Sequence, residues 1–288
     1  MTTISPELLA LCDRMPAFPA SVQQVISLAS DINSPPKKLV RVIDHDPVLT
    51  MKILKVANSA YFGLSRKIIS INHAVVYLGL NTVKHVALAI AAIGSLPRDN
   101  NANFDMDDFL LHSLSTAVLT RSLAQKLRIP ETEAANFFVA GLLHDIGQVV
   151  FAQFKPEEYS KVLHQSRTSE SALNDAEKEM FGFDHGEVGA VLGTQWDFPE
   201  ELVNAIRMHH IPGTGARNSN IRKCLFVANL LAARVNQPTN APPAMNEEDM
   251  PPWVFSTFGN DFSSIIEEMD NLESDLQQAT SLLQVSAT

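Results

Sequence analysis

The side chains best suited to chemistry in this chain are histidines and aspartates that recur on its predicted helices. His144 and Asp145 are adjacent within the apolar run FFVAGLLHDIGQVVF at 137–151. Such a run is typical of a buried helix, and a buried carboxylate without a partner either loses its charge or needs a hydrogen-bond network or a cation. The pair therefore predicts a polar centre inside the core.

Further ligand-type residues lie on helix faces and at helix ends, where they could join this centre. Asp108 and His112 are four residues apart and share a helix face. His185 begins a predicted helix, and His209 and His210 end another, where the negative end of the helix dipole suits a cation. Imidazole and carboxylate ligands fit Fe, Mn or Zn better than Ca or Mg. The expected cofactor is therefore a divalent transition metal.

The same residue types also have an interpretation that involves no metal. A single histidine in a helix is most often an ordinary core or surface side chain. We leave out of the predicted site the histidines that lack comparable surroundings, namely His45, His73, His85 and His164. A functional role for the His144-Asp145 pair is supported by the apolar helix around it and by the other histidines at helix faces and ends.

The elements that would position these residues are helices, because strand-like alternation is scarce. Gly63 and Gly79 are expected to end two of them, and Ser70 or Asn72 to cap the start of one. We expect helices near 5–13, 19–30, 36–44, 47–60, 71–79, 82–95, 105–127, 131–152, 157–166, 170–181, 185–196, 199–210 and 218–235, and a final helix after them. The predicted fold class is all-α.

Polar and proline-rich stretches divide the chain into three parts. The turn-rich segment RDNNANF at 98–104 separates an N-terminal helical subdomain, 1–104, from a second helical subdomain, 105–235, that holds the His/Asp site. In the third part, 236–288, five prolines and three acids at 237–252 predict an extended linker before an acidic amphipathic helix. The three parts carry net charges of +4, −5 and −9.

Bulk composition narrows the classes of protein to which the chain could belong. It has 288 residues, of which 45% are hydrophobic, and two distant cysteines, Cys12 and Cys224, which favours a reduced intracellular protein. No basic region precedes an apolar run at the N-terminus, so no secretory signal is expected. The apolar stretch Val86–Leu96 is shorter than the roughly 20 residues that span a bilayer. We therefore expect a cytoplasmic protein without a membrane partner.

The predicted C-terminal helix has an apolar seam between acidic flanks. It could pack on the core of its own chain, or dock on the basic front of the chain or on a basic partner. Like charges disfavour a homodimeric coiled coil, although a homodimer stays open as an oligomeric state. The seam consists of Phe262, Ile265, Met269, Leu272, Leu276, Ala279 and Leu283.

The run HDIG at 144–147, with His112 before it and His209-His210 after it, resembles the HD superfamily of metal-dependent phosphohydrolases. The stretches MPAFPASVQQVISLAS, IDHDPVLTMKILKVANSAYFGL and SINHAVVYLGLNTVKHVALAI resemble the HDOD family, the regulatory relatives of HD domains. The resemblance covers roughly residues 13–235. It implies an HD-like helical bundle preceded by an N-terminal helical subdomain.

The resemblance also implies a set of metal ligands, with two departures from the pattern of the cyclic-dinucleotide phosphodiesterases. A late aspartate of that pattern falls at Asn229, an amide that would bind a metal more weakly. The lysine that usually follows HDIG is Gln148, which cannot supply a charge to a phosphate. The implied site holds one or two ions, with Fe or Mn first and Zn or Ni as alternatives. Its ligands are Asp108, His112, His144, Asp145, His185, His209, His210 and Asn229.

Three functions follow from these features. The first is a bacterial signal-transduction protein, weakly catalytic or non-catalytic, that keeps the metal site and binds a partner protein or a nucleotide second messenger. The second is a metal-dependent phosphohydrolase acting on a phosphodiester such as a cyclic dinucleotide, with Asp145 as the catalytic residue. The third, DNA binding, would need the helices within 73–92 to act as a helix-turn-helix, yet only Lys84 and His85 lie on the second of them. Nucleic acid is therefore not the expected partner.

Overall fold

In the computed structural model every regular element of the described residues is a helix, which confirms the predicted all-α class. The structure describes residues 5–15, 20–30, 35–58, 67–94, 96, 100–168, 171–213, 219–236, 247–269, 272 and 276. The helices are α1 (Pro6–Cys12), α2 (Ala20–Ser30), α3 (Pro36–Asp44), α4 (Pro47–Ala57), α5 (Ile71–Leu78), α6 (Leu80–Gly94), α7 (Met106–Lys126), α8 (Glu131–Leu143), α9 (Ile146–Phe154), α10 (Pro156–Thr168), α11 (Leu173–Phe181), α12 (His185–Gln195), α13 (Glu200–Arg207), α14 (Asn220–Asn236), the 3-10 helix η2 (Glu247–Asp249), α15 (Pro252–Phe258) and α16 (Phe262–Glu267).

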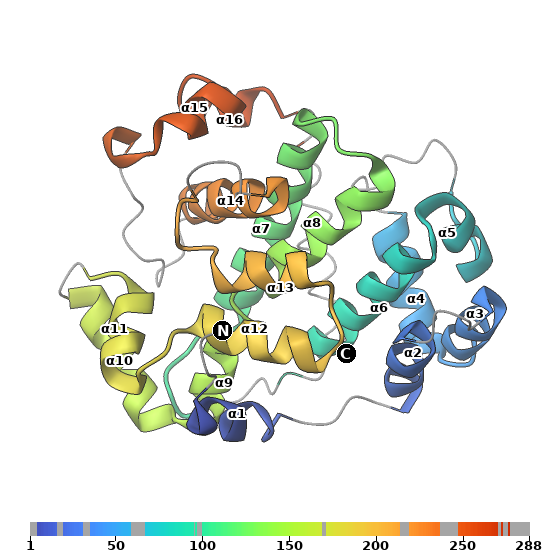
Figure 1. Cartoon of the computed structure of the whole chain (residues 1–288), viewed down its shortest axis with the longest axis horizontal. Coiled ribbons are helices and arrows are strands. Elements are labelled where there is room, and N and C mark those ends of the chain that lie inside the picture. The colour runs from blue at the N-terminus through green and yellow to red at the C-terminus, as the bar shows by residue number, and fades with distance from the viewer. Residues whose placement is uncertain are drawn as a thin grey trace.

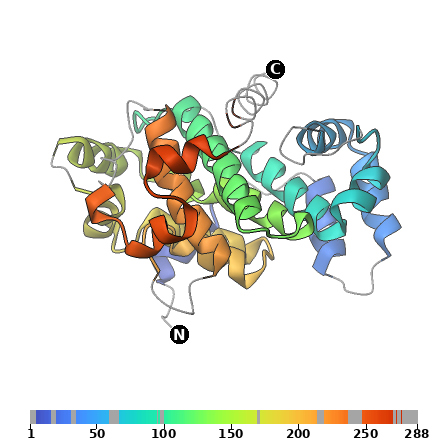
Figure 2. The ribbon, with the colours of Figure 1, turned by 90° about the horizontal axis from the view of Figure 1, so that it is seen from above.

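Helices α2–α5 form one end of the molecule, and the α10–α11 pair lies at the other (Figures 1 and 2). The predicted cap of α5 is confirmed, because the Ser70 hydroxyl accepts the main-chain N–H of His73 at 3.2 Å. Gly79 ends α5 with a φ of 84°, the left-handed region that favours glycine. The other predicted stop, Gly63, lies outside the described residues.

The centre of the molecule is a bundle in which α7 packs against both α8 and α14 (Figure 1). The two backbones of α7 and α8 come unusually close at Gly141, where a Cβ would lie 2.4 Å from the Cα of Ala117. Helix α6 packs on α8 and so joins the N-terminal helices to this bundle. Among the predicted ligands, this bundle carries Asp108 and His112 on α7 and Asn229 on α14.

Helix α1 packs on α9 and α12, away from the other N-terminal helices (Figure 1). The Gln195 amide donates to the Asp13 carboxylate at 2.9 Å, and the Lys155 ammonium lies 3.6 Å from the Glu7 carboxylate. Burial raises the pKa of the Cys12 thiol to about 12, so this cysteine is an unreactive core residue. The predicted boundary at residue 104 stays a prediction. Helix α1, although it comes before that boundary, packs against helices of the predicted second subdomain.

The single helix predicted at 131–152 is wrong in one respect. Two helices occupy this stretch, because α8 ends at Leu143 and α9 begins at Ile146. His144 and Asp145 form the turn between them, and the Gln148 N–H bonds to the Asp145 carbonyl at 2.9 Å. Periodicity could not reveal this break, since the residues on both sides of it are buried and apolar.

The expected linker at 237–252 is partly wrong. Residues 247–249 form a 3-10 turn and α15 begins at Pro252, while 237–246 lie outside the described residues. The C-terminal segment packs on its own chain beside α14 (Figure 1), with the Arg234 guanidinium 4.2 Å from the centroid of the Phe262 ring. Three residues of the predicted seam are buried, namely Phe262, Ile265 and Leu272. Ala279 and Leu283 lie outside the described residues.

One stretch of the described residues, Glu133–Phe154, is long and apolar enough to cross a membrane on its own. It runs over α8 and α9, and 83% of its most apolar window is buried inside the protein. Such burial is typical of a core helix, because a membrane span would present its apolar side chains to lipid.

Candidate metal centre

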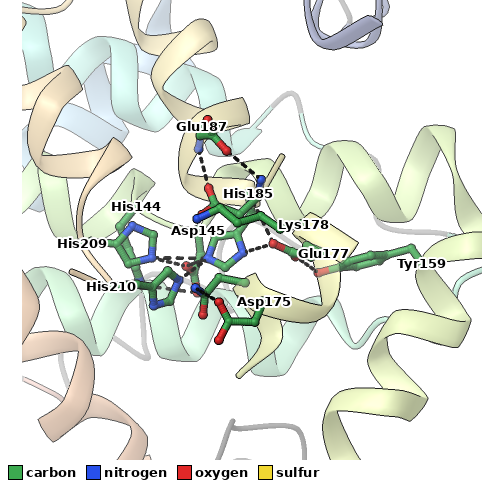
Figure 3. Close-up of polar contacts among 12 residues, drawn as sticks. His144, Asp145, Tyr159, Asp175, Glu177, Lys178, His185, Glu187, His209 and His210 are labelled. Atoms are coloured by element: carbon green, nitrogen blue, oxygen red, sulfur yellow. Dashed lines mark hydrogen bonds and ion pairs between the residues drawn. The ribbon is translucent and has the colours of Figure 1, made fainter. Parts of the chain in front are cut away.

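Six of the predicted ligand residues converge on one buried point from four places in the chain, and Figure 3 labels all of them except His112. His112 lies on α7, His144 and Asp145 lie in the turn between α8 and α9, and His185 is the first residue of α12. His209 and His210 follow the end of α13. Three of the imidazoles are completely inaccessible to solvent, those of His144, His185 and His209.

The carboxylate of Asp145 is the centre of this arrangement. Its Oδ1 lies 3.1 Å from Nε2 of His185 and 3.3 Å from Nε2 of His209. Its Oδ2 lies 3.3 Å from Nε2 of His144 and 3.7 Å from Nε2 of His112. Each oxygen of one carboxylate therefore faces its own pair of imidazoles.

These contacts define two groups of metal-ligand type that share Asp145. Within each group the ligand atoms lie within 4.8 Å of one another. That spread is close to what one ion requires, because protein ligands bind a metal such as zinc at about 2.0–2.2 Å. One group consists of Asp145, His185, His209 and His210, and the other of His112, His144 and Asp145.

The Nδ1 atoms of two of these histidines are anchored by main-chain carbonyls. His144 Nδ1–H donates to the carbonyl of Gly141 at 2.7 Å, and His209 Nδ1–H donates to that of Ile206 at 2.6 Å. A carbonyl can only accept, so the proton lies on Nδ1 and Nε2 keeps its lone pair. Both lone pairs face Asp145. Metal-binding histidines usually have this arrangement, in which one ring nitrogen donates to a carbonyl and the other is left for the metal.

Orphaned polar atoms provide a test of whether these residues fit a metal. His144 Nε2 and Asp145 Oδ1 are buried and have no hydrogen-bond partner among the described residues, although imidazole nitrogens approach the oxygen. Buried polar atoms are nearly always satisfied in proteins, and leaving them unsatisfied costs about 1–3 kcal/mol each. A divalent cation would satisfy both atoms at once, so the residues present fit a metal.

The pKa values of the cluster follow from its burial. Burial lowers the pKa of His112 to about 4, and it also lowers the pKa values of His209 and His210. These imidazoles are therefore neutral at pH 7, which is the protonation state that binds a metal. Burial acts against the charge of Asp145, but His144 and His185 hold its pKa well below its usual range.

Burial would also lower the pKa of His185, but Glu177 and Asp145 raise it well above its ordinary value. His185 is held between these two carboxylates, with Glu177 at Nδ1 and Asp145 at Nε2. A metal ion bound at Nε2 would replace the proton on that nitrogen, so metal binding at this histidine releases a proton.

The remaining predicted ligands lie less centrally. The Asn229 side chain on α14 reaches the site, and its Oδ1 accepts a hydrogen bond from His112 Nε2–H at 2.9 Å. Asp108 lies one turn before His112 on α7 and belongs to neither group of ligand atoms. Gln148 is half-buried in the first turn of α9. That Asp108 and Asn229 bind a metal stays a prediction.

One residue of the site was missed by the sequence reasoning. Glu177 on α11 is completely buried, and its carboxylate contacts His185. A signal was available, because Glu177 lies on the same face of α11 as the buried residues Leu173 and Ala176. An acid on the apolar face of an amphipathic helix indicates a buried partner.

Comparison with known proteins agrees with this fold. The chain is 24% identical to a candidate phosphohydrolase from Shewanella amazonensis SB2B, with a TM-score of 0.73 over 97% of this chain and 99% of that one. It is also 24% identical to an HDOD domain protein of unknown function from Geobacter sulfurreducens, with a TM-score of 0.72 over 96% of this chain and 98% of that one. At these identities the likeness shows the fold alone.

A curated relative, an uncharacterized protein from Treponema pallidum (strain Nichols), is 26% identical over 204 residues, which make up 70% of this chain. The chain spans 39% of the length of that relative. The model of the HDOD domain matches residues 15–212, from before α2 to just after the His209-His210 pair. Since that match covers more than half of its residues, the chain belongs to the HDOD domain family.

Proposed function

We propose that this chain is a bacterial, cytoplasmic signal-transduction protein whose buried cluster binds a divalent transition metal in a structural or sensory role. The observation that carries the proposal is the orientation of His144 and His209, each with Nδ1 anchored on a carbonyl and Nε2 facing Asp145. In a core held by hydrogen bonds alone, the buried His144 Nε2 would have a partner, yet it has none among the described residues. Fe or Mn is the first expectation, with Zn or Ni as alternatives.

Such a module would bind a partner protein or a nucleotide second messenger. The family resemblance supports this part of the proposal, since HDOD proteins are regulatory relatives of HD domains. Two positions argue against an efficient enzyme. Gln148 cannot offer the charge of a lysine to a phosphate, and Asn229 replaces a carboxylate ligand. Loss of one transition-state donor typically costs about 10²–10³ in rate.

Elemental analysis of the purified protein tests the metal part. The wild-type protein should carry one or two ions per chain, and Asp145→Asn should lose them, because Asp145 belongs to both groups of ligand atoms. His164→Ala is the matched control, since His164 is an exposed histidine outside the cluster. A wild-type protein that stays metal-free after incubation with Fe²⁺, Mn²⁺, Zn²⁺ and Ni²⁺ would contradict the proposal.

A metal-dependent phosphohydrolase is the second candidate, and the sharing of Asp145 between two ligand groups favours it. A bound metal pair supplies Lewis acidity and an ionised water near neutral pH. In that case Asp145, which belongs to both groups of ligand atoms, would help to hold the metal and would be the catalytic residue. The rate of cyclic dinucleotide hydrolysis by the metal-loaded protein decides between the two candidates. A typical enzyme turns over its substrate about 10 times per second. A rate of that order would favour the second candidate.

A further inference from the structure

The buried carboxylate of Glu177 lies on the opposite side of the His185 ring from Asp145 (Figure 3). Its Oε2 accepts the His185 Nδ1–H at 2.5 Å and the main-chain N–H of the same residue at 2.8 Å. Its Oε1 accepts the Tyr159 hydroxyl at 3.2 Å. Both oxygens of this acid are therefore engaged, and two of its three bonds are made to His185.

These bonds fix His185 in two ways. Because an ionised carboxylate only accepts hydrogen bonds, the contact with Oε2 keeps a proton on Nδ1 and leaves Nε2 as the ligand atom. The bond to the main-chain N–H ties the same oxygen to the first residue of α12. Tyr159 on α10 in turn holds the carboxylate from behind. Ring, backbone and carboxylate thus form one connected unit.

We propose that Glu177 is a positioning residue of the metal centre, which sets the tautomer and orientation of His185 so that Nε2 faces the ion. Tyr159 supports Glu177 in this role. The inference rests on the proposed function, because it requires a metal beside Asp145. Carboxylates that accept the second N–H of a ligand histidine raise its basicity, and their removal typically weakens metal binding by about 10–100-fold.

A purely structural role for Glu177 would be to cap α12, but that helix already has a cap. The Asp184 carboxylate accepts the main-chain N–H of Glu187 at 2.8 Å, and the Glu187 carboxylate accepts that of Asp184 at 3.1 Å. This reciprocal pair is a complete capping box. Glu187 therefore offers a matched control, an acid at the start of the same helix whose bonds go to the cap.

The decisive experiment compares Glu177→Gln with Glu187→Gln in the full-length chain. Metal affinity is measured by competition with a chromophoric chelator for Zn²⁺, and thermal unfolding is followed in parallel. Glu177→Gln should weaken Zn²⁺ binding by about 10–100-fold, while Glu187→Gln should leave it within about twofold of wild type. A folded Glu177→Gln protein with wild-type affinity would overturn the inference.

A measurement on the wild-type protein decides the case if Glu177→Gln does not fold. Long-range ¹H–¹⁵N NMR correlations of the Zn²⁺-loaded protein distinguish the two ring nitrogens of each histidine. His185 should show a protonated Nδ1 and a metal-bound Nε2, and Tyr159→Phe should shift its Nδ1 resonance. Binding through Nδ1 would overturn the role of Glu177. A wild-type protein that binds no metal would instead contradict the proposed function itself.

Discussion

The main chain at Gly147 lies directly against His185: a Cβ at position 147 would come 2.2 Å from the His185 carbonyl oxygen. Real Cβ atoms essentially never approach that closely. The glycine therefore lets the first turn of α9 pack on the start of α12. This contact helps to bring Asp145, two residues before Gly147, within 3.1 Å of the His185 ring. The glycine of the HDIG run is therefore explained by the close packing of two helices and not by metal binding.

Gly147→Ala should therefore disturb both stability and metal binding. The obstructing atom belongs to the backbone and cannot rotate away, so overpacking should lower the free energy of unfolding by about 1–3 kcal/mol. Urea unfolding measures the loss. Gly94→Ala is the control, because a Cβ there would meet only the flexible end of Lys52 at 3.8 Å. Equal stability of both variants would show that the two backbones can move apart.

Much of the site was predictable because its residues are conspicuous. His144 and Asp145 stand out in an apolar run, and the other ligand histidines lie on helix faces or at helix ends, where a local pattern places them. The prediction that these residues share one site came from the resemblance to a known family. Residue spacing within separate helices does not determine the distance between those helices. The all-α class followed from periodicity alone.

The features that were missed depend on tertiary contacts. The apolar face of α11 indicates that Glu177 is buried, but LNDAEKEMF is rich in charges, and the partner that Glu177 meets depends on the packing of α10 and α12 around it. The turn at His144 and Asp145 was hidden for the opposite reason, because residues on both sides are equally apolar. Local sequence indicates which residues are buried, but it does not indicate which partner a buried polar group meets.

Asn229→Asp should strengthen metal binding. The Asn229 Oδ1 lies 2.9 Å from His112 Nε2, so a carboxylate at this position would place a negative charge beside one ligand group. We expect affinity for Zn²⁺ to rise by about tenfold, which corresponds to about 1.4 kcal/mol. Asn220→Asp makes the same change at the exposed start of α14 and should have no such effect. Unchanged affinity in Asn229→Asp would place the ion away from His112.

His85 should make the fold sensitive to acid. It is buried at the contact between α6 and α8, with Nδ1 2.5 Å from Oδ1 of Asn136, and burial lowers its pKa to about 4. Below pH 6.5 the unfolded chain binds a proton at this residue that the folded chain does not accept until about pH 4. Stability is therefore lost as the pH falls through this window, by about 3 kcal/mol in total.

Urea unfolding between pH 7 and pH 4.5 measures this effect. His85→Gln should flatten the profile relative to wild type, because the substituted side chain carries no titrating group. His73→Gln is the control, as His73 is an exposed histidine on α5. Parallel profiles for wild type and His85→Gln would show that His85 is protonated equally readily in the folded and unfolded chains.

The C-terminal segment should stabilise its own chain through apolar packing, with little contribution from its charges. Phe262 is 3% exposed, and the Arg234 guanidinium lies over its ring. Phe262→Ala should lower the free energy of unfolding by about 3 kcal/mol, as for other buried phenylalanines. Glu268→Gln removes the ion pair with Lys126, but the Glu268 side chain is 58% exposed, so the loss should stay below about 0.5 kcal/mol. If Phe262→Ala left the stability of the isolated chain unchanged, the acidic helix would instead be a segment that docks on a partner.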